Sequence, residues 1–211
     1  MRLQGDGMTL VSVVIPTYQR PALLMGRALP SVLAQTHQEL DIHVVGDGTD
    51  EVTCVAMEWL VRQDSRVRFT NLPHADYPTD PEARWCAMGV PPINYGLDTA
   101  RGEWVSVLAD DDALPPDAYA LMLAASEGVD CVYGRTEVVD HGVYGKPGEW
   151  TDGAYILRSA LGYRYDADSW KRGVIADFDL RTRLLREVRT RHLPEIVYRY
   201  WPAHKVPPVY A

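Results

Sequence analysis

The chain has 211 residues, of which 46% are hydrophobic and 24% charged, and its formal net charge is −8. This composition is typical of one globular domain, and the acidic balance argues against a protein that grips nucleic-acid phosphates through a basic face. The three cysteines stand far apart and form no zinc motif or disulfide framework. No run reaches the roughly 20 apolar residues of a membrane span, and residues 1–7 hold no apolar signal core. We therefore expect a cytoplasmic protein without a transmembrane segment.

The first part of the chain alternates between strand and helix patterns. Helical spacing of apolar residues predicts helices at 21–35 and 51–63, and Pro30 is expected to kink or end the first of these. A nearly continuous apolar run predicts a buried strand at 10–15, and two further strands are predicted at 41–46 and, shorter, at 66–70. This β-α-β-α-β order favours an α/β fold, a Rossmann-like, mainly parallel sheet flanked by helices.

The second part of the chain is less regular. A helical pattern at 82–100 is expected to break at Gly89–Pro92, and the polar, irregular segment 163–174 is expected to form a mobile lid. The other predicted elements are strands at 104–108, 130–139 and 194–200, helices at 117–126 and 176–190, a short apolar element at 154–161 and a glycine-rich loop at 141–153.

Three consecutive carboxylates, Asp110, Asp111 and Asp112, stand just after the predicted strand 104–108. Like charges this close raise one another's pKa unless a cation compensates them. Oxygen ligands on a short loop suit a hard divalent ion such as Mg²⁺ or Mn²⁺. The alternative interpretation is a solvated acidic turn in which one Asp caps the next helix.

Other polar side chains also come directly after predicted strands. Thr17 and Tyr18 follow the first strand, and Asp47 follows the second. Ligands of doubly wound sheets bind beyond the carboxyl ends of the strands. We therefore expect these side chains and the Asp cluster to converge on one rim, which favours a metal site over an acidic turn.

Seven short segments, in order along the chain, are also informative about function. They are Val11–Arg20 (VSVVIPTYQR), Gly46–Asp50 (GDGTD), Asn94–Trp104 (NYGLDTARGEW), Leu108–Leu114 (LADDDAL), Tyr155–Leu161 (YILRSAL), Ala176–Leu180 (ADFDL) and Tyr198–His204 (YRYWPAH). Together they resemble the motifs of glycosyltransferase family 2, nucleotide-sugar enzymes of the GT-A fold. The resemblance implies a single GT-A domain over 1–211, with a nucleotide-sugar-binding half at about 10–112 and an acceptor-side half and tail at about 113–211.

The chain departs from the usual family motifs at four positions. The residues are Gly46 and Ala109 where the family often has Asp, Ile93 where it often has Arg, and Ala176 where it has Glu. These differences concern nucleotide and acceptor specificity more than the fold.

The resemblance implies a divalent ion, Mn²⁺ or Mg²⁺, that spans the diphosphate of the donor and stabilises the charge of the leaving group. By this resemblance Asp112 is the direct metal ligand, and Asp111 or Asp110 holds the ribose or a metal-bound water. His204 in the closing segment fits a second contact to the metal or the diphosphate, since a neutral imidazole can ligate Mn²⁺. The alternative for His204 is a surface histidine in the tail.

The attacking hydroxyl needs a base, and the resemblance assigns Asp177 to this role. The alternative is that Asp177 caps a helix beginning at 178. Asp179 is two residues further on and would point elsewhere on a helix. One base without a second nucleophile suggests an inverting displacement.

The nucleotide is expected to lie against residues at the ends of the first two strands. Pro16, Thr17 and Tyr18 would line the base pocket, and Asp47 would accept a hydrogen bond from the base or ribose. Arg84 is a candidate to replace the Arg missing beside Asn94, whereas we expect Arg20 on the surface of the first helix. The loop aromatics Trp150, Tyr163, Tyr165 and Trp170 would stack on a sugar acceptor or simply pack.

The sequence thus predicts a metal-dependent, inverting glycosyltransferase that uses a UDP, GDP or dTDP sugar. The acceptor would be a glycan, a protein or a small molecule, and the acidic net charge makes a nucleic-acid acceptor less expected. Whether the chain forms a homodimer is left open. One alternative is a degenerate, non-catalytic nucleotide- or sugar-binding module. Another is a nucleotidylyltransferase, which usually shows a glycine-rich loop after its first strand, and residues 16–20 contain no glycine.

Overall fold

The computed structural model describes residues 9–149 and 153–202. The strands are β1 (Val11–Thr17), β2 (Leu40–Asp47), β3 (Val67–Leu72), β4 (Trp104–Val107), β5 (Cys131–Val138), β6 (Gly142–Tyr144), β7 (Tyr155–Arg158) and β8 (Thr190–Tyr200). The helices are α1 (Pro21–Leu23), a π-helical segment (Leu24–Ala28), α2 (Leu29–Leu33), α3 (Glu51–Gln63), α4 (Pro81–Ala87), α5 (Val90–Asp98), α6 (Ala118–Ala124) and α7 (Ala176–Glu187), with 3₁₀ turns at Ser159–Leu161 and Ser169–Arg172. No helix of the described ranges is both long and apolar enough to cross a membrane.

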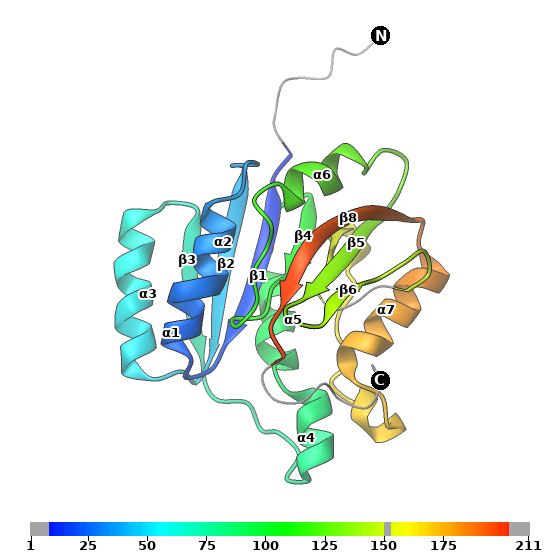
Figure 1. Cartoon of the computed structure of the whole chain (residues 1–211). Coiled ribbons are helices and arrows are strands. Elements are labelled where there is room, and N and C mark those ends of the chain that lie inside the picture. Colours follow the sequence, from blue (N-terminus) through cyan, green and yellow to red (C-terminus); the bar gives the residue numbers. More distant parts are fainter. Residues whose placement is uncertain (1–8, 150–152, 203–211) are drawn as a thin grey trace.

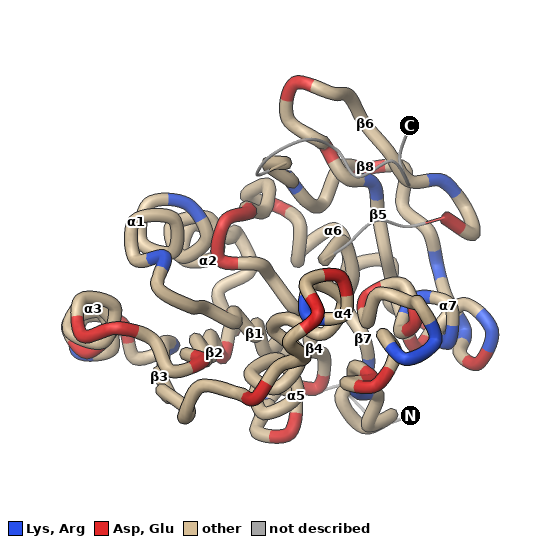
Figure 2. The backbone as a smooth tube through the Cα atoms, turned by 90° about the horizontal axis from the view of Figure 1, so that it is seen from below, with Lys and Arg blue, Asp and Glu red and all other residues tan. Residues whose placement is uncertain are grey.

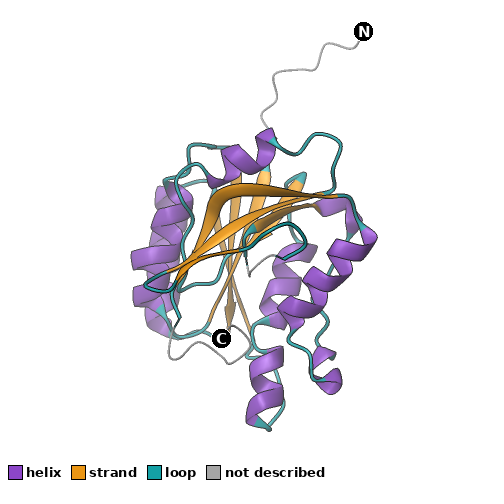
Figure 3. Ribbon diagram, turned by 45° about the vertical axis from the view of Figure 1, so that its right-hand side comes forward, coloured by secondary structure: helices purple, strands orange, loops and turns teal. Residues whose placement is uncertain are grey.

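In the part of the chain described, the strands form one sheet with helices on both faces (Figures 1 and 3). The order is β3-β2-β1-β4-β7-β5-β6, and β8 pairs with β5. β1 lies between β2 and β4, and β3 extends the same parallel set. β7 runs antiparallel between β4 and β5, whereas β8 pairs with β5 in parallel. The predicted α/β fold with a mainly parallel, helix-flanked sheet is confirmed.

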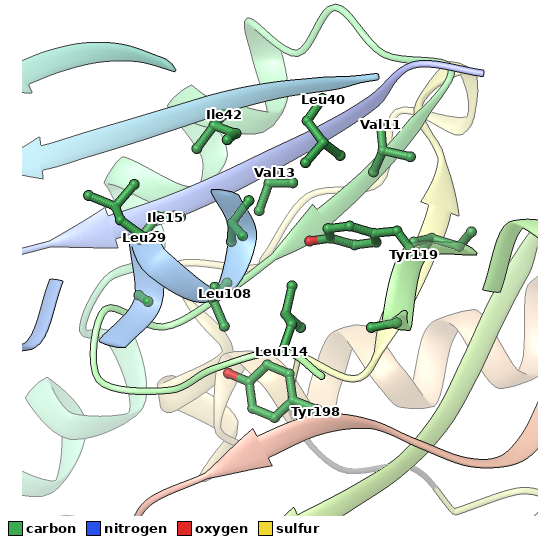
Figure 4. Close-up of a cluster of buried hydrophobic side chains, with 14 of the residues drawn as sticks. Val11, Val13, Ile15, Leu29, Leu40, Ile42, Leu108, Leu114, Tyr119 and Tyr198 are labelled. Atoms are coloured by element: carbon green, nitrogen blue, oxygen red, sulfur yellow. The ribbon is translucent and has the colours of Figure 1, made fainter. Parts of the chain in front are cut away.

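The central strand β1 is buried on both faces, so its side chains enter two separate cores. Val11, Val13 and Ile15 join the core beneath α2, α3 and α6. Figure 4 shows these side chains facing Leu108 and Leu114, with Tyr198 of β8 beside Leu114. Val14 joins the opposite core, which α5 and α7 cover. Two-sided burial explains why this stretch reads as a continuous apolar run.

The helix predicted at 21–35 does not end at Pro30. Pro30 has no N–H for the carbonyl of Gly26, and its ring would crowd that carbonyl in a regular α-helix. The chain instead widens into the π-helical segment, where the Leu29 N–H reaches the carbonyl of Leu24, and then continues as α2. Such one-turn π-helical segments occur inside α-helices, and here the wider turn relieves the clash at Pro30.

The segment 163–174, expected to be a mobile lid, is tied to the core. The side-chain amide of Asn94 on α5 pairs with both backbone groups of Tyr165, at 2.9 Å for each bond. The Tyr165 side chain is buried, and its hydroxyl lies 3.1 Å from that of Tyr155. The predicted loop 141–153 also contains a short strand, β6, that pairs with β5.

Helix α5 lies close to β1 at Gly96. A Cβ atom at Gly96 would fall 2.3 Å from Cγ1 of the buried Val14. No side-chain carbon fits there without moving the helix away from the strand. Gly96 of the Asn94–Trp104 segment is therefore a packing requirement.

We expect Gly96→Ala to lower the free energy of unfolding by about 1–3 kcal/mol, because the added methyl group overpacks the contact with Val14. Gly26→Ala is the matched control, since a Cβ at Gly26 meets nothing within 4 Å. It should be neutral or stabilising by up to about 1 kcal/mol. Urea denaturation of both variants makes the comparison, and equal effects would contradict the close approach.

Candidate active site

A pocket of about 240 Å³ lies beyond the carboxyl ends of the parallel strands. Its lining is Pro16, Thr17, Tyr18, Arg20, Asp47, His74, Tyr77, Arg84, Met88, Gly89, Pro92, Ala109, Asp110 and Asp111. The seven residues that the sequence predicts to contact the nucleotide are all in this lining. The structure therefore brings them together, and their roles toward a ligand stay predictions.

The end of β1 is joined to the acidic loop after β4 by a buried hydrogen bond. The Thr17 hydroxyl donates to Oδ2 of Asp110 at 2.8 Å. Burial raises the pKa of Asp110 to about 6, although the Thr17 bond and the nearby Arg20 charge oppose the rise. The carboxylate thus sits in a place where a positive charge would stabilise its ionised form.

Arg20 does not lie on the outer surface of the first helix, as the sequence suggested, but in the pocket wall. Its Nη1 is 2.7 Å from Oδ2 of Asp111 and 3.4 Å from Oδ1 of Asp110. The neighbouring Arg27 donates to the backbone carbonyl of Asp111 and lies over the ring of Trp201. Two guanidinium groups therefore flank the acidic loop.

Asp112, the predicted metal ligand, is absent from the pocket lining and only 2% exposed. Its Oδ2 accepts the Tyr198 hydroxyl at 2.8 Å, and its Oδ1 accepts the backbone N–H of Trp201 at 3.0 Å. The carboxylate thus joins the acidic loop to the end of β8. Direct metal coordination by Asp112 stays a prediction.

Asp47 at the end of β2 holds the loop that follows β3. Its Oδ1 accepts the backbone N–H of Ala75 at 2.8 Å, and its Oδ2 accepts the Tyr77 hydroxyl at 2.7 Å. The ring of His74 from this loop stacks on Tyr18 at 4.8 Å. Burial and the Asp47 charge raise the pKa of Tyr77, so its phenol stays a donor at neutral pH. Asp47 therefore shapes the pocket wall, and its contact with a nucleotide is still a prediction.

Arg84 lies on α4 at the far side of the pocket, with its guanidinium 5.9 Å from the centre of the Tyr77 ring. The Tyr77 hydroxyl also accepts the backbone N–H of Gly89 at 3.2 Å. The Tyr77 hydroxyl thus links the loop after β3 to the junction between α4 and α5.

Asp177 lies half-buried in the first turn of α7, which begins at Ala176 after the N-cap position Ile175. It is therefore not the cap of a helix starting at 178. Asp179 accepts bonds from Arg172 at 2.9 Å and Arg183 at 2.8 Å, one on each carboxylate oxygen. Figure 2 shows this mixture of acidic and basic residues around α7. Asp177 is not in the pocket lining, and its role as base is untested.

The predicted acceptor aromatics have different environments. Tyr165 is packed in the core, and the Tyr163 hydroxyl donates to Glu187 at 2.7 Å. Trp170 lies in a 3₁₀ turn beneath the ammonium group of Lys171. Trp150 and His204 lie outside the described residues.

Sequence reasoning missed several residues of the pocket wall, among them His74, Tyr77 and Gly89. A signal for the first two existed, because their loop follows β3, the next parallel strand of the same sheet edge. Gly89 was read only as a helix break. Within residues 9–149 and 153–202, no cluster of three or more His, Cys, Asp or Glu side chains is arranged to hold a metal ion.

We expect Asp112→Ala to lose about 1–3 kcal/mol of unfolding free energy in buffer containing EDTA, because it removes the carboxylate that accepts from the Tyr198 hydroxyl and the Trp201 N–H. Urea denaturation measures the loss. Asp117→Ala is the control, since Asp117 is exposed and makes no capping bond. An Asp112 variant as stable as wild type without metal would show that this carboxylate does not hold the loop.

Comparison with known proteins places this geometry in context. Residues 9–164 match the family model described as Glycosyltransferase like family 2. A curated relative from Campylobacter jejuni, GalNAc(5)-diNAcBac-PP-undecaprenol beta-1,3-glucosyltransferase, is 32% identical over 136 residues, which are 64% of this chain and 40% of the relative. The matched region thus spans less than half the length of that protein.

Solved structures share the fold at low sequence identity. S. aureus TarS in complex with UDP superposes with a TM-score of 0.75 and 17% identity, over 92% of this chain and 60% of that one. A mannosyltransferase from Pyrobaculum calidifontis, in complex with GDP-Man and Mn²⁺, has a TM-score of 0.64 and 16% identity, over 92% and 57%. With a family match across most of its length and the same GT-A architecture, this chain belongs to glycosyltransferase-like family 2.

Proposed function

We propose that this protein transfers a sugar from a nucleoside-diphosphate sugar to an acceptor hydroxyl, with a divalent ion and with inversion at the anomeric carbon. The observation that carries the proposal is the pocket at the carboxyl edge of the sheet. It combines two carboxylates, Asp110 and Asp111, with the guanidinium of Arg20 and the ring of Tyr18. Carboxylates, a phosphate-binding cation and a stacking surface suit a metal-bound nucleotide diphosphate.

The chemistry of the acidic loop fits a divalent cation. Asp110 and Asp111 offer carboxylate oxygens at the pocket, and Mg²⁺ or Mn²⁺ commonly binds one or two carboxylates together with substrate phosphates. A bound ion would neutralise charge on the departing diphosphate. We propose that Asp112 holds the acidic loop in shape. His204, three residues beyond Trp201, keeps its predicted role as a second contact to the metal or the diphosphate.

The donor is proposed from the pocket and from related structures. TarS was solved with UDP and with UDP-GlcNAc, and the Pyrobaculum enzyme with GDP-Man. The stacked Tyr18 and His74 rings would form one wall beside the base, and Thr17 and Pro16 border the same space. UDP sugars are the first donors to test, because the UDP-bound structure has the higher TM-score.

Asp177 is proposed as the base that accepts the proton of the acceptor hydroxyl. The choice of Asp177 over Asp179 rests on the resemblance of Ala176–Leu180 to the family motif, in which Asp177 stands at the position of the base. Direct attack assisted by one base inverts the anomeric centre. The proposed acceptor is a glycan hydroxyl, since the name of the Campylobacter relative describes glucose transfer to a lipid-linked glycan. A cytoplasmic location and a homodimer stay predictions.

We expect UDP and Mn²⁺ together to raise the thermal stability of the protein. A ligand at about 100 times its Kd adds about 2.7 kcal/mol to the unfolding free energy. The measurement is a thermal-shift titration with UDP, GDP and dTDP, each with Mn²⁺ and with EDTA. If no nucleotide gives a metal-dependent shift, the transferase proposal fails.

We expect Asp177→Asn to reduce sugar transfer about 10²–10⁴-fold while leaving the affinity for UDP unchanged, because the amide cannot accept the proton. UDP release from UDP sugars, with and without glycan acceptors, gives the rate. Asp179→Asn is the matched variant and should retain most activity after correction for stability. Equal activity of Asp177→Asn and wild type would exclude Asp177 as base, and a wild type that binds UDP without turnover would favour a non-catalytic binding module.

A further inference from the structure

Arg20 combines a backbone held at the start of α1 with a partly exposed side chain. Its backbone carbonyl accepts the first hydrogen bonds of α1, from the N–H groups of Leu23 and Leu24. The side chain is 45% exposed and reaches across the pocket wall to the acidic loop. Its guanidinium can therefore change partners while the main chain stays in place.

The guanidinium engages the carboxylate oxygens that a divalent ion would use. Arg20 Nη1 is 2.7 Å from Oδ2 of Asp111 and 3.4 Å from Oδ1 of Asp110, while Oδ2 of Asp110 accepts the Thr17 hydroxyl. Arg20 thereby offsets the repulsion between the two carboxylates. A divalent ion ligated by Asp111 Oδ2 would lie close to the guanidinium that now contacts this oxygen, and repulsion between the two positive charges would favour displacement of Arg20.

The same guanidinium lines the space proposed for the donor. Arginine binds phosphate through two parallel hydrogen bonds, which makes a diphosphate a suitable second partner. We propose that Arg20 is an exchanging counter-cation. It pairs with Asp110 and Asp111 when no divalent ion is bound, and it turns to the diphosphate of the donor when an ion takes the carboxylates. The inference rests on the proposed function, because it concerns the same donor pocket.

If Arg20 exchanges partners in this way, replacing it should strengthen the binding of Mn²⁺ alone and weaken the binding of UDP. Arg20→Met removes the competitor for Asp111, so Mn²⁺ alone should bind about two- to fivefold more tightly, as expected for a partly exposed ion pair. The same variant loses a charged partner of the diphosphate, so UDP should bind about tenfold more weakly at saturating Mn²⁺. An arginine with a purely structural role would weaken both or change neither.

The experiment measures the two affinities separately. Electron paramagnetic resonance of free Mn²⁺ gives the affinity for Mn²⁺ alone, and calorimetry gives the affinity for UDP at saturating Mn²⁺. Arg20→Lys keeps the charge but not the fork of donors, so it should bind Mn²⁺ like wild type and UDP more weakly. Arg62→Met is the control, since Arg62 lies on α3 and pairs with Glu58, and neither affinity should change.

The outcomes separate this inference from the proposed function. A wild type that takes up no Mn²⁺, either alone or with UDP, refutes the metal dependence and the exchange together. A wild type that binds Mn²⁺ and UDP, with both affinities of Arg20→Met unchanged or moved in the same direction, overturns the exchange alone. Circular dichroism checks folding, and if Arg20→Met does not fold, Arg20→Lys decides: unchanged UDP binding would overturn the exchange.

Discussion

The buried carboxylate of Asp112 joins the two parts of the chain at the pocket. It accepts hydrogen bonds from Tyr198 and from the backbone of Trp201, so the loop after β4 takes its shape from the end of β8. The neighbouring Asp111 and Asp110 can face the pocket because Asp112 faces the core. A buried carboxylate is costly unless its oxygens are satisfied, and here backbone and phenol donors satisfy them. The shape of the pocket in this fold therefore depends on how the end of β8 packs in the core.

The segment Asn94–Trp104 illustrates how a sequence motif follows from packing. Gly96 permits the approach of α5 to β1, and the Asn94 amide binds both backbone groups of Tyr165. The asparagine thereby fixes the chain that leads to α7, on which Asp177 lies. At its other end, Gly102 meets backbone atoms of β1 so closely that a Cβ would fall 2.6 Å from the nitrogen of Ser12. The motif is therefore a set of close packing contacts that place α5 and the segment at Tyr165 relative to β1.

Much of this arrangement could be predicted from the sequence, for a physical reason. The carboxyl ends of parallel strands lie at one edge of the sheet. Once the strands are recognised in the sequence, Thr17, Asp47 and Asp110 are therefore predicted to lie close together. Side-chain direction could not be predicted in the same way. The partner of Asp112 is 86 residues away, and the bond between them follows from the pairing of β8 with β5. The position of β7 between β4 and β5 likewise depends on long-range pairing that no local pattern encodes.

The distance in sequence between Asp112 and β8 has a consequence for how the protein folds. Contacts between β1, β2 and β3 close comparatively short loops, whereas the bonds from Tyr198 and Trp201 close a loop of almost half the chain. Loop-closure entropy grows with length, and pairings of high contact order form slowly. On a growing polypeptide, the acidic loop emerges long before the strand that shapes it. Strands β1, β2 and β3 can thus assemble first, whereas the pocket reaches its final form only after β4 has paired with β1 and the last strand has docked.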